Sequence, residues 1–315
     1  MRLGLVANRL HHSHSQAALF RWLRRCESGI RELNLGLHAV GGTYDAIVRE
    51  GVLRDHSPLL RYPCGREGGL VKIVADLVGL DEADVLDGAI YLADPVDASS
   101  TFPEALALRR QCIVNQKPLL PTVASACDWI ETERILAGFA PDDGADHFYT
   151  LSSQTLALIA HDAMKPQLLT FADRHFDLLS RFKLRVATGT TGKHLNELAW
   201  RHGWPQGEPW VKCYLSGPLG GDAQIANLVF QRHCQRVIFF EDPHIARQHE
   251  ADIQLLERSV TATTDDTVCI MCPVAATRWV EAAEQRAKLR SANTQTQHAV
   301  ATFHTEATYD TPCCD

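Results

Sequence analysis

Short apolar runs alternate along this chain with longer stretches in which apolar residues recur every three or four positions. The runs LGLVA at 3–7, LALIA at 156–160 and VIFF at 237–240 are typical examples. Runs of this length predict buried strands, and the periodic stretches between them predict helices. Such an alternation is typical of βαβ units and therefore predicts an α/β fold with mainly parallel sheets.

The whole pattern occurs twice, at a nearly constant offset. Five segments have counterparts: LGLVANR at 3–9 and LALIAHD at 156–162, HAVGGTY at 38–44 and VATGTTG at 186–192, GREGGL at 65–70 and GPLGGD at 217–222, YLADPVD at 91–97 and FFEDPHI at 239–245, PTVASACDWI at 121–130 and CPVAATRWV at 272–280. This self-similarity indicates tandem copies of one Rossmann-like three-layer domain. We predict domains at 1–137 and 154–290, a linker at 138–153 and an irregular polar tail at 291–315.

Composition narrows the class of protein. The 315 residues are 45% hydrophobic and carry a net charge of −7, which is ordinary for a globular protein. No apolar run approaches the ~18 residues of a membrane helix, and Lys and Arg form no basic stripe. We therefore expect a cytoplasmic protein without a membrane or nucleic-acid partner. Cys269 and Cys272 form a C-x-x-C in an apolar run with no second pair, which favours core packing over a zinc site.

Polar residues follow the predicted strands of the second copy, where ligands bind in open parallel sheets. In chain order they are His161, Asp162 and Lys165, then the run Thr188–Gly192, then Ser216, Gly217 and Asp222, and finally Asp242, His249 and Asp252. Threonines and glycines at the start of a helix offer hydroxyl and N–H groups that favour an anion. The set predicts one cleft with an anion cradle and several titratable groups.

Each of these residues also has a purely structural interpretation. Lys165 suits a solvated helix position, Asp222 suits a helix N-cap, and His249 and Asp252 suit the polar start of a helix. The functional interpretation therefore depends on their joint placement at the strand ends.

Four segments, AHDAMK, ATGTTG, SGPLGGD and FFEDPHIARQHEAD, resemble in order and spacing the motifs of methylglyoxal synthases, over roughly residues 154–282. The resemblance implies a carbon–oxygen lyase that converts dihydroxyacetone phosphate to methylglyoxal and inorganic phosphate. It implies that the enzyme uses no metal and no cofactor and that it assembles as a homo-oligomer. It also implies that inorganic phosphate is a product or an inhibitor.

The resemblance also implies roles for individual residues. Asp222 matches the base that takes the proton from the carbon beside the carbonyl. His249 matches the histidine that polarises the substrate oxygens, and Asp252 matches its nearby carboxylate. His161 matches a substrate contact. The phosphate-binding positions are Lys165, Thr188, Gly189, Thr190, Thr191, Ser216 and Gly217, and Asp162 and Asp242 fall on family-like positions with less defined roles.

The first copy lacks most of this set. Leu70 stands in place of Asp222, and the remaining replacements are Asn8 for His161, Arg9 for Asp162, Val40 for Thr188, Thr101 for His249 and Glu104 for Asp252. We predict a non-catalytic first copy that packs against the second. Gly41, Gly42, Thr43, Arg9 and Arg66 leave anion binding open there. The C-terminal arginine that the family uses near its phosphate has no counterpart in FHTEATYDTPCCD.

Two other functions stay open. ATGTTGKH at 187–194 comes within one residue of a nucleotide-binding P-loop, but His194 stands where magnesium needs Ser or Thr. A tandem regulatory module that binds a phosphorylated metabolite is the other alternative. Retention of Asp222, His249 and Asp252 argues against it, because binding alone needs no carbon-acid base.

Overall fold

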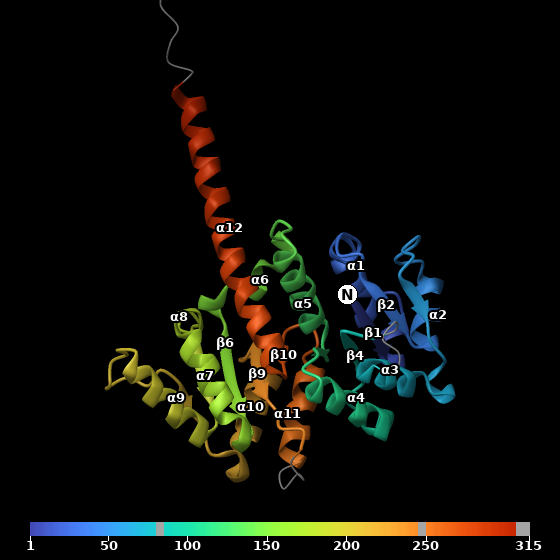
Figure 1. Ribbon diagram of the computed structural model, residues 1–315, viewed down its shortest axis with the longest axis horizontal. Coiled ribbons are helices and arrows are strands. Elements are labelled where there is room, and N and C mark those ends of the chain that lie inside the picture. Colours follow the sequence, from blue (N-terminus) through green and yellow to red (C-terminus); the bar gives the residue numbers. More distant parts are fainter. Residues whose placement is uncertain (80–84, 245–249, 307–315) are drawn as a thin grey trace, which may run out of the picture.

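A computed structural model describes residues 1–79, 85–244 and 250–306, and in these residues the chain forms two five-stranded parallel sheets (Figure 1). The first sheet has the order β3-β2-β1-β4-β5 and the second the order β8-β7-β6-β9-β10. The strands are β1 (Arg2–Ala7), β2 (Gly36–Ala39), β3 (Leu59–Arg61), β4 (Gly88–Leu92), β5 (Leu119–Leu120), β6 (Thr155–Ala160), β7 (Leu184–Ala187), β8 (Lys212–Cys213), β9 (Arg236–Phe240) and β10 (Val268–Ile270). The predicted α/β class is confirmed.

The central strands of the two sheets have equivalent neighbours. β1 pairs with β2 through Leu5 and Ala39 and with β4 through Ala7 and Leu92. β6 pairs with β7 through Leu158 and Ala187 and with β9 through Ala160 and Phe240. Every residue of β6 is buried, which explains why this strand is a continuous apolar run rather than an alternating one.

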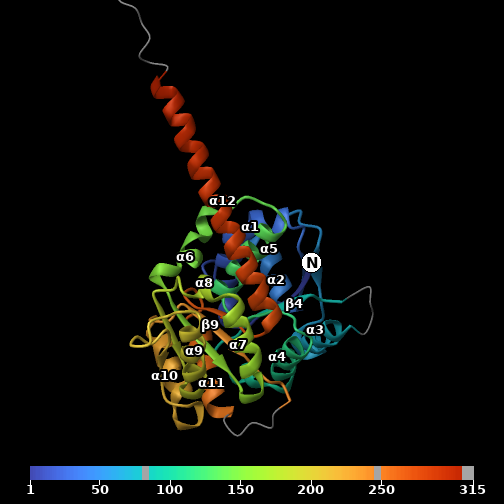
Figure 2. The ribbon, with the colours of Figure 1, turned by 60° about the vertical axis from the view of Figure 1, so that its left-hand side comes forward.

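Helices pack on both sheets (Figures 1 and 2). Those of the first half are α1 (Ala18–Glu32), α2 (Gly41–Glu50), α3 (Gly69–Val78), α4 (Pro103–Val114) and α5 (Val123–Leu136). Those of the second half are α7 (Lys165–Arg174), α8 (Phe176–Leu179), α9 (Gly189–Arg201), α10 (Gly221–Phe230), α11 (Glu250–Ala262) and α12 (Pro273–Glu306). Short 3₁₀ turns precede several of these helices, among them η2 (Gly65–Glu67), η7 (Asp162–Met164) and η8 (Gly217–Leu219).

The segment predicted as a linker is folded. Residues 143–153 form three short turns of helix, η5 (Asp143–Ala145), α6 (Asp146–Tyr149) and η6 (Leu151–Ser153). Ala145, Phe148 and Leu151 recur every third residue and are buried. These three apolar side chains pack into the core.

The predicted irregular tail is also different in the structure. α12 continues through Glu306, so residues 291–306 are helical, and Figures 1 and 2 show this part of the helix extending beyond the body of the molecule. The first turns pack through Trp279 and Val280, which are buried. No Gly or Pro follows Pro273 within the helix. A nucleated helix therefore continues at little cost per residue, even without an amphipathic pattern.

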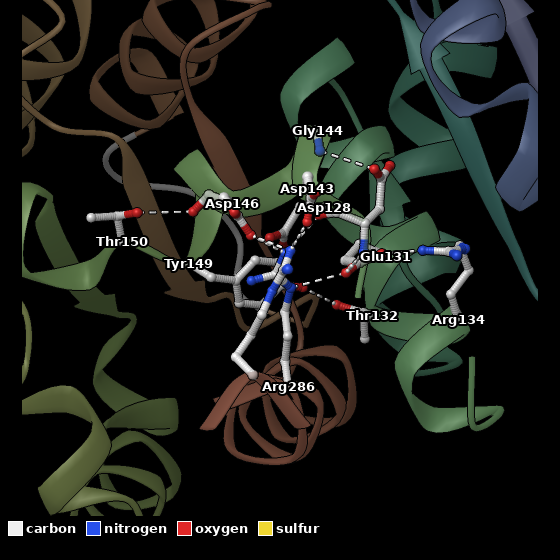
Figure 3. A network of polar contacts seen from close by, with 12 residues as sticks. Asp128, Glu131, Thr132, Arg134, Asp143, Gly144, Asp146, Tyr149, Thr150 and Arg286 are labelled. Carbon is white, nitrogen blue, oxygen red and sulfur yellow. Dashed lines mark hydrogen bonds and ion pairs between the residues drawn. The ribbon is translucent and has the colours of Figure 1, made fainter. Parts of the chain in front are cut away.

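The two halves share one packed interior. α5 contacts both α1 of the first half and α12 of the second. Arg236 of β9 is completely buried, and its guanidinium bonds both carboxylate oxygens of Asp128 at 2.8 and 2.9 Å. Arg286 of α12 donates to Glu131 of α5 at 2.9 Å and to Asp146 at 2.6 Å, and Figure 3 shows the arginine between these two acids. Charged side chains thus join the halves at several buried points.

In the described part of the chain, no helix is both long enough and apolar enough to span a membrane.

Candidate functional site

The predicted site residues from His161 to Asp242 lie along the carboxyl-terminal edge of the second sheet. They follow the carboxyl ends of β6, β7, β8 and β9, which are parallel neighbours in the sheet. β6 lies between β7 and β9, and the direction in which the chain builds the sheet reverses there. Such a topological switch point opens a crevice in α/β sheets and is their usual ligand site.

The run of threonines and glycines starts helix α9. Thr188 is its N-cap, and Gly192 N–H donates to the carbonyl oxygen of Thr188 at 2.7 Å. Thr190 and Thr191 lie in the first turn, where backbone N–H groups have no partner inside the helix. These N–H groups and the positive end of the helix dipole favour an anion at this point.

The side chain of Thr191 strengthens this assignment. Its hydroxyl is buried and has no hydrogen-bond partner among the described residues, and the residue is only 2% exposed. A buried hydroxyl without a partner costs free energy. In the first half the corresponding Thr43 Oγ1 accepts a hydrogen bond from Ala7 N–H at 3.0 Å. The hydroxyl of Thr191 therefore lacks the hydrogen bond that its counterpart makes.

Glycines bring the next turn of chain against α9. Gly189 N–H donates to the carbonyl oxygen of Leu215 at 2.9 Å, and a Cβ at Gly189 would lie 3.0 Å from Ser216 N. A Cβ at Gly221 would lie 1.9 Å from the Leu215 oxygen, so no larger residue fits there. The Ser216–Gly217 turn consequently lies beside the first turn of α9.

Asp222 lies over this turn. It occupies the first turn of α10, whose N-cap is Gly220 in the left-handed conformation with φ of 96°. Asp222 is therefore not the N-cap, which was its structural alternative. A Cβ at Gly217 would lie 2.7 Å from Asp222 Oδ2. The carboxylate thus lies close to the Ser216–Gly217 backbone, next to the candidate anion cradle.

Lys165 and Asp162 form an ion pair at the end of β6. Lys165 Nζ lies 2.5 Å from Asp162 Oδ1, and the side chains are 19% and 89% exposed. The lysine stem is therefore mostly enclosed while the aspartate faces water. This arrangement holds the ammonium near the strand end, while the Asp162 carboxylate faces solvent.

His161 is oriented by the end of β9. Its Nδ1 accepts a hydrogen bond from Asp242 N–H at 2.9 Å, and its ring meets Phe239 edge to face at 5.0 Å. Burial lowers the pKa of the His161 imidazole, so the ring is neutral near pH 7. With Nδ1 as acceptor, the proton of the neutral ring is on Nε2, which can donate to a ligand.

The two remaining predicted catalytic residues are His249 and Asp252. His249 lies outside the described residues. Asp252 belongs to α11, which packs along α10, the helix that carries Asp222. The backbone therefore places Asp252 on a helix next to the site, and its predicted role stays a prediction.

The first half repeats the backbone of this site without its chemistry. Gly41 N–H donates to Pro63 O, as Gly189 does to Leu215 O, and Gly68 and Gly69 match Gly220 and Gly221. The Glu67 carboxylate, however, accepts a hydrogen bond from Cys64 N–H at 3.1 Å. An internal carboxylate thus occupies the N–H group that corresponds to that of Ser216, and Leu70 replaces the acid.

The described residues contain no group of three or more His, Cys, Asp or Glu side chains that could hold a metal ion. Cys269 and Cys272 are buried, and burial raises their thiol pKa values to about 12 and about 11. Both thiols therefore remain protonated at neutral pH and pack as small apolar groups.

Two charged residues near the site were not singled out from the sequence. Glu241 directly precedes Asp242, is 2% exposed, and binds Arg109 of the first half. A carboxylate at the end of the apolar run VIFF was a usable signal, because buried acids need partners. Nothing in the local sequence pointed to Arg109. Arg109 and Phe239 also line a cavity of about 380 Å³ between the halves, which neither Thr191 nor Asp222 lines.

The fold and the site together define a parallel α/β domain with a candidate anion cradle at its switch point. Curated relatives place the chain more closely. Methylglyoxal synthase from Thermus thermophilus is 44% identical over 105 residues, which are 33% of this chain and 76% of the relative. The enzyme from Clostridium beijerinckii is 41% identical over 103 residues, 33% of this chain and 79% of the relative. This chain therefore belongs to the methylglyoxal synthase family.

The crystal structure of methylglyoxal synthase from Elizabethkingia anophelis NUHP1 matches 41% of this chain and 78% of its own, with 34% identity and a TM-score of 0.33. No protein-family model matches the chain.

Proposed function

We propose that this chain is a methylglyoxal synthase whose active site lies in its second half. The observation that carries the proposal is the meeting of three elements at one sheet edge: the first turn of α9, the Ser216–Gly217 turn and the carboxylate of Asp222. Because the chain belongs to the methylglyoxal synthase family, we assign to this site the conversion of dihydroxyacetone phosphate to methylglyoxal and inorganic phosphate.

In this proposal Asp222 is the general base. Its carboxylate takes a proton from the carbon beside the substrate carbonyl, and the electron pair of the C–H bond forms an enediolate. His161 donates a hydrogen bond from Nε2 to the developing oxyanion, and the neutral ring that its lowered pKa provides suits this role. His249 is proposed to polarise the same oxygens, with Asp252 as its carboxylate partner.

The phosphate group is proposed to lie at the first turn of α9. The N–H groups of Thr190 and Thr191, the hydroxyls of Thr191 and Ser216, and the ammonium of Lys165 supply donors of the kind a phosphate requires. As the enediolate collapses, the C–O bond breaks, its electron pair leaves with the phosphate, and these donors stabilise the departing charge. The enol that remains takes up a proton at the carbon that carried the phosphate and becomes methylglyoxal. The buried, unpaired hydroxyl of Thr191 supports this placement.

The first half is proposed to be non-catalytic, with domains at 1–137 and 154–290. Leu70 cannot act as a base, and the Glu67 carboxylate occupies the amide that would bind phosphate. The Thr43 hydroxyl is already engaged, because it accepts a hydrogen bond from Ala7 N–H and donates one to the Ala7 carbonyl oxygen. For these reasons we also expect no anion site in the first half.

A tandem sensor of a phosphorylated metabolite is the second candidate, because the cradle of α9 would serve binding as well as catalysis. Release of methylglyoxal and phosphate from dihydroxyacetone phosphate by the intact chain distinguishes the two: a sensor binds the substrate without consuming it. The oligomeric state, proposed to be a homo-oligomer, is measured by light scattering of the same sample.

A further inference from the structure

The first half of the chain contacts the candidate site of the second half through two consecutive arginines. Arg109 donates from Nε and Nη2 to Glu241 Oε2 at 2.9 and 2.6 Å. Arg110 donates from Nε to the carbonyl oxygen of Pro243 at 3.2 Å. Helix α4 thus holds the residues on both sides of Asp242, whose N–H orients His161.

The contact between Arg109 and Glu241 is buried. The Arg109 and Glu241 side chains are 6% and 2% exposed, and Arg109 also pairs with Glu257 of α11. Charges this deep are held in place, because separating them would leave each without a partner in a poorly solvated interior. The contact with Pro243, by comparison, is exposed at its arginine, so Arg109 is the stronger constraint.

The arginine of this contact comes from the first half and its acceptor from the second, and the sequence does not repeat the arrangement the other way round. Arg109 and Glu257 lie the same number of residues after the ends of the equivalent strands β4 and β9, Leu92 and Phe240. Glu241 directly follows β9, whereas Ala93 follows β4 at the equivalent position and offers no side-chain acceptor. For the reverse interaction the second half therefore lacks the arginine and the first half lacks the acceptor, so only the half that has Asp222 is held in this way.

We propose that Arg109 of the first half is a positioning residue for the active site of the second: by holding Glu241 it fixes the Asp242 backbone N–H against His161 Nδ1. This proposal rests on the proposed function for its catalytic consequence. It gives the non-catalytic half a defined task, which is to hold His161 in the tautomer and orientation that present Nε2–H to the substrate.

The test replaces Arg109 with Met and reads the His161 ring directly in the full-length chain. ¹⁵N NMR at neutral pH reports which ring nitrogen carries the proton, and amide exchange reports the protection of Asp242 N–H; neither needs turnover. Arg134→Met is the matched control, because Arg134 is also a mostly buried arginine of the first half, paired with Glu32 and Glu131 instead.

In Arg109→Met we expect a mixture of His161 tautomers, faster exchange of the Asp242 amide and at least a tenfold loss of kcat/KM for methylglyoxal formation. Arg109→Lys, which keeps the charge but loses the two-nitrogen contact, should fall between wild type and Arg109→Met. Arg134→Met should lower the melting temperature while leaving the His161 tautomer and the Asp242 amide unchanged.

A folded Arg109→Met protein with the wild-type tautomer, Asp242 protection and kcat/KM would overturn the proposal. If Arg109→Met does not fold, Arg109→Lys and Glu241→Gln are judged by the same three readouts. An inactive wild type would refute the proposed function alone, because the NMR and exchange measurements still decide whether Arg109 fixes His161.

Discussion

The carboxylate of Asp222 lies against the backbone of Gly217, so closely that a Cβ at Gly217 would be 2.7 Å from Asp222 Oδ2. A side chain at position 217 would therefore displace the carboxylate of the proposed base without changing its chemistry. At the equivalent position of the first half, a Cβ at Gly65 would meet no atom within 4 Å.

Gly217→Ala is therefore expected to displace the Asp222 carboxylate and to lower kcat for methylglyoxal formation by about 10- to 100-fold, the effect of a misplacement near 1 Å. Gly65→Ala is the matched control and should leave kcat within twofold of wild type. Steady-state kinetics on dihydroxyacetone phosphate measures both. Equal kcat values for the two variants would refute the placement of Asp222 over Gly217.

The two buried threonine hydroxyls give a second matched pair. Thr191 Oγ1 has no partner among the described residues, whereas Thr43 Oγ1 accepts from Ala7 N–H. Thr43→Val should destabilise the fold by about 1–3 kcal/mol, because it leaves a buried N–H unpaired. Thr191→Val should cost little stability but weaken phosphate binding. Urea unfolding and isothermal titration with inorganic phosphate test this crossed pattern, and a large stability loss in Thr191→Val would contradict it.

Stability is expected to fall as the pH falls below 6.5. Burial lowers the pKa values of His161 and His175 from their usual 6.5. Between the lowered and the usual value the unfolded chain binds more protons than the native one, so acid favours unfolding by at most about 1.4 kcal/mol per pH unit and proton. The free energy of unfolding, measured by urea from pH 7.5 to 5.0, gives the slope.

His161→Gln and His175→Gln separate stability from catalysis. Each should flatten the pH dependence of stability, but only His161→Gln should also change the pH profile of kcat/KM, since His175 lies between α7 and α8, outside the candidate site. An unchanged activity profile in His161→Gln would remove His161 from the proposed mechanism.

The ion pair between Arg236 and Asp128 is expected to hold the halves together. Arg236 is completely buried, so Arg236→Leu should cost about 3–5 kcal/mol by leaving Asp128 unpaired in the interior. Arg232→Leu is the control: its pair with Asp266 is 70% and 42% exposed and should contribute at most about 1 kcal/mol. Denaturant unfolding of both variants, followed by far-UV circular dichroism, makes the comparison. Equal losses would mean that the buried pair is not a structural link.

The strands and the anion cradle could be predicted because their signals are local. LALIA and VIFF are continuous apolar runs, and the glycines around Ser216 are required by contacts within a few residues. The folded segment at 143–153 was not predicted, because three apolar residues are too few to stand out as a period in the sequence. The extension of α12 over residues 291–306 was not predicted, because this part of the sequence has no apolar periodicity. The pair of Arg109 and Glu241 joins positions far apart in the chain, and only the packing of the halves brings them together.

The most direct test of this account compares Asp222→Asn with Leu70→Asn, its counterpart in the first half, for release of methylglyoxal and phosphate from dihydroxyacetone phosphate. The account predicts an active wild type, a loss of at least about 100-fold in Asp222→Asn, as expected for removal of a general base, and near wild-type rates in Leu70→Asn. A wild type that binds dihydroxyacetone phosphate without releasing either product, or an Asp222→Asn variant of undiminished activity, would contradict it.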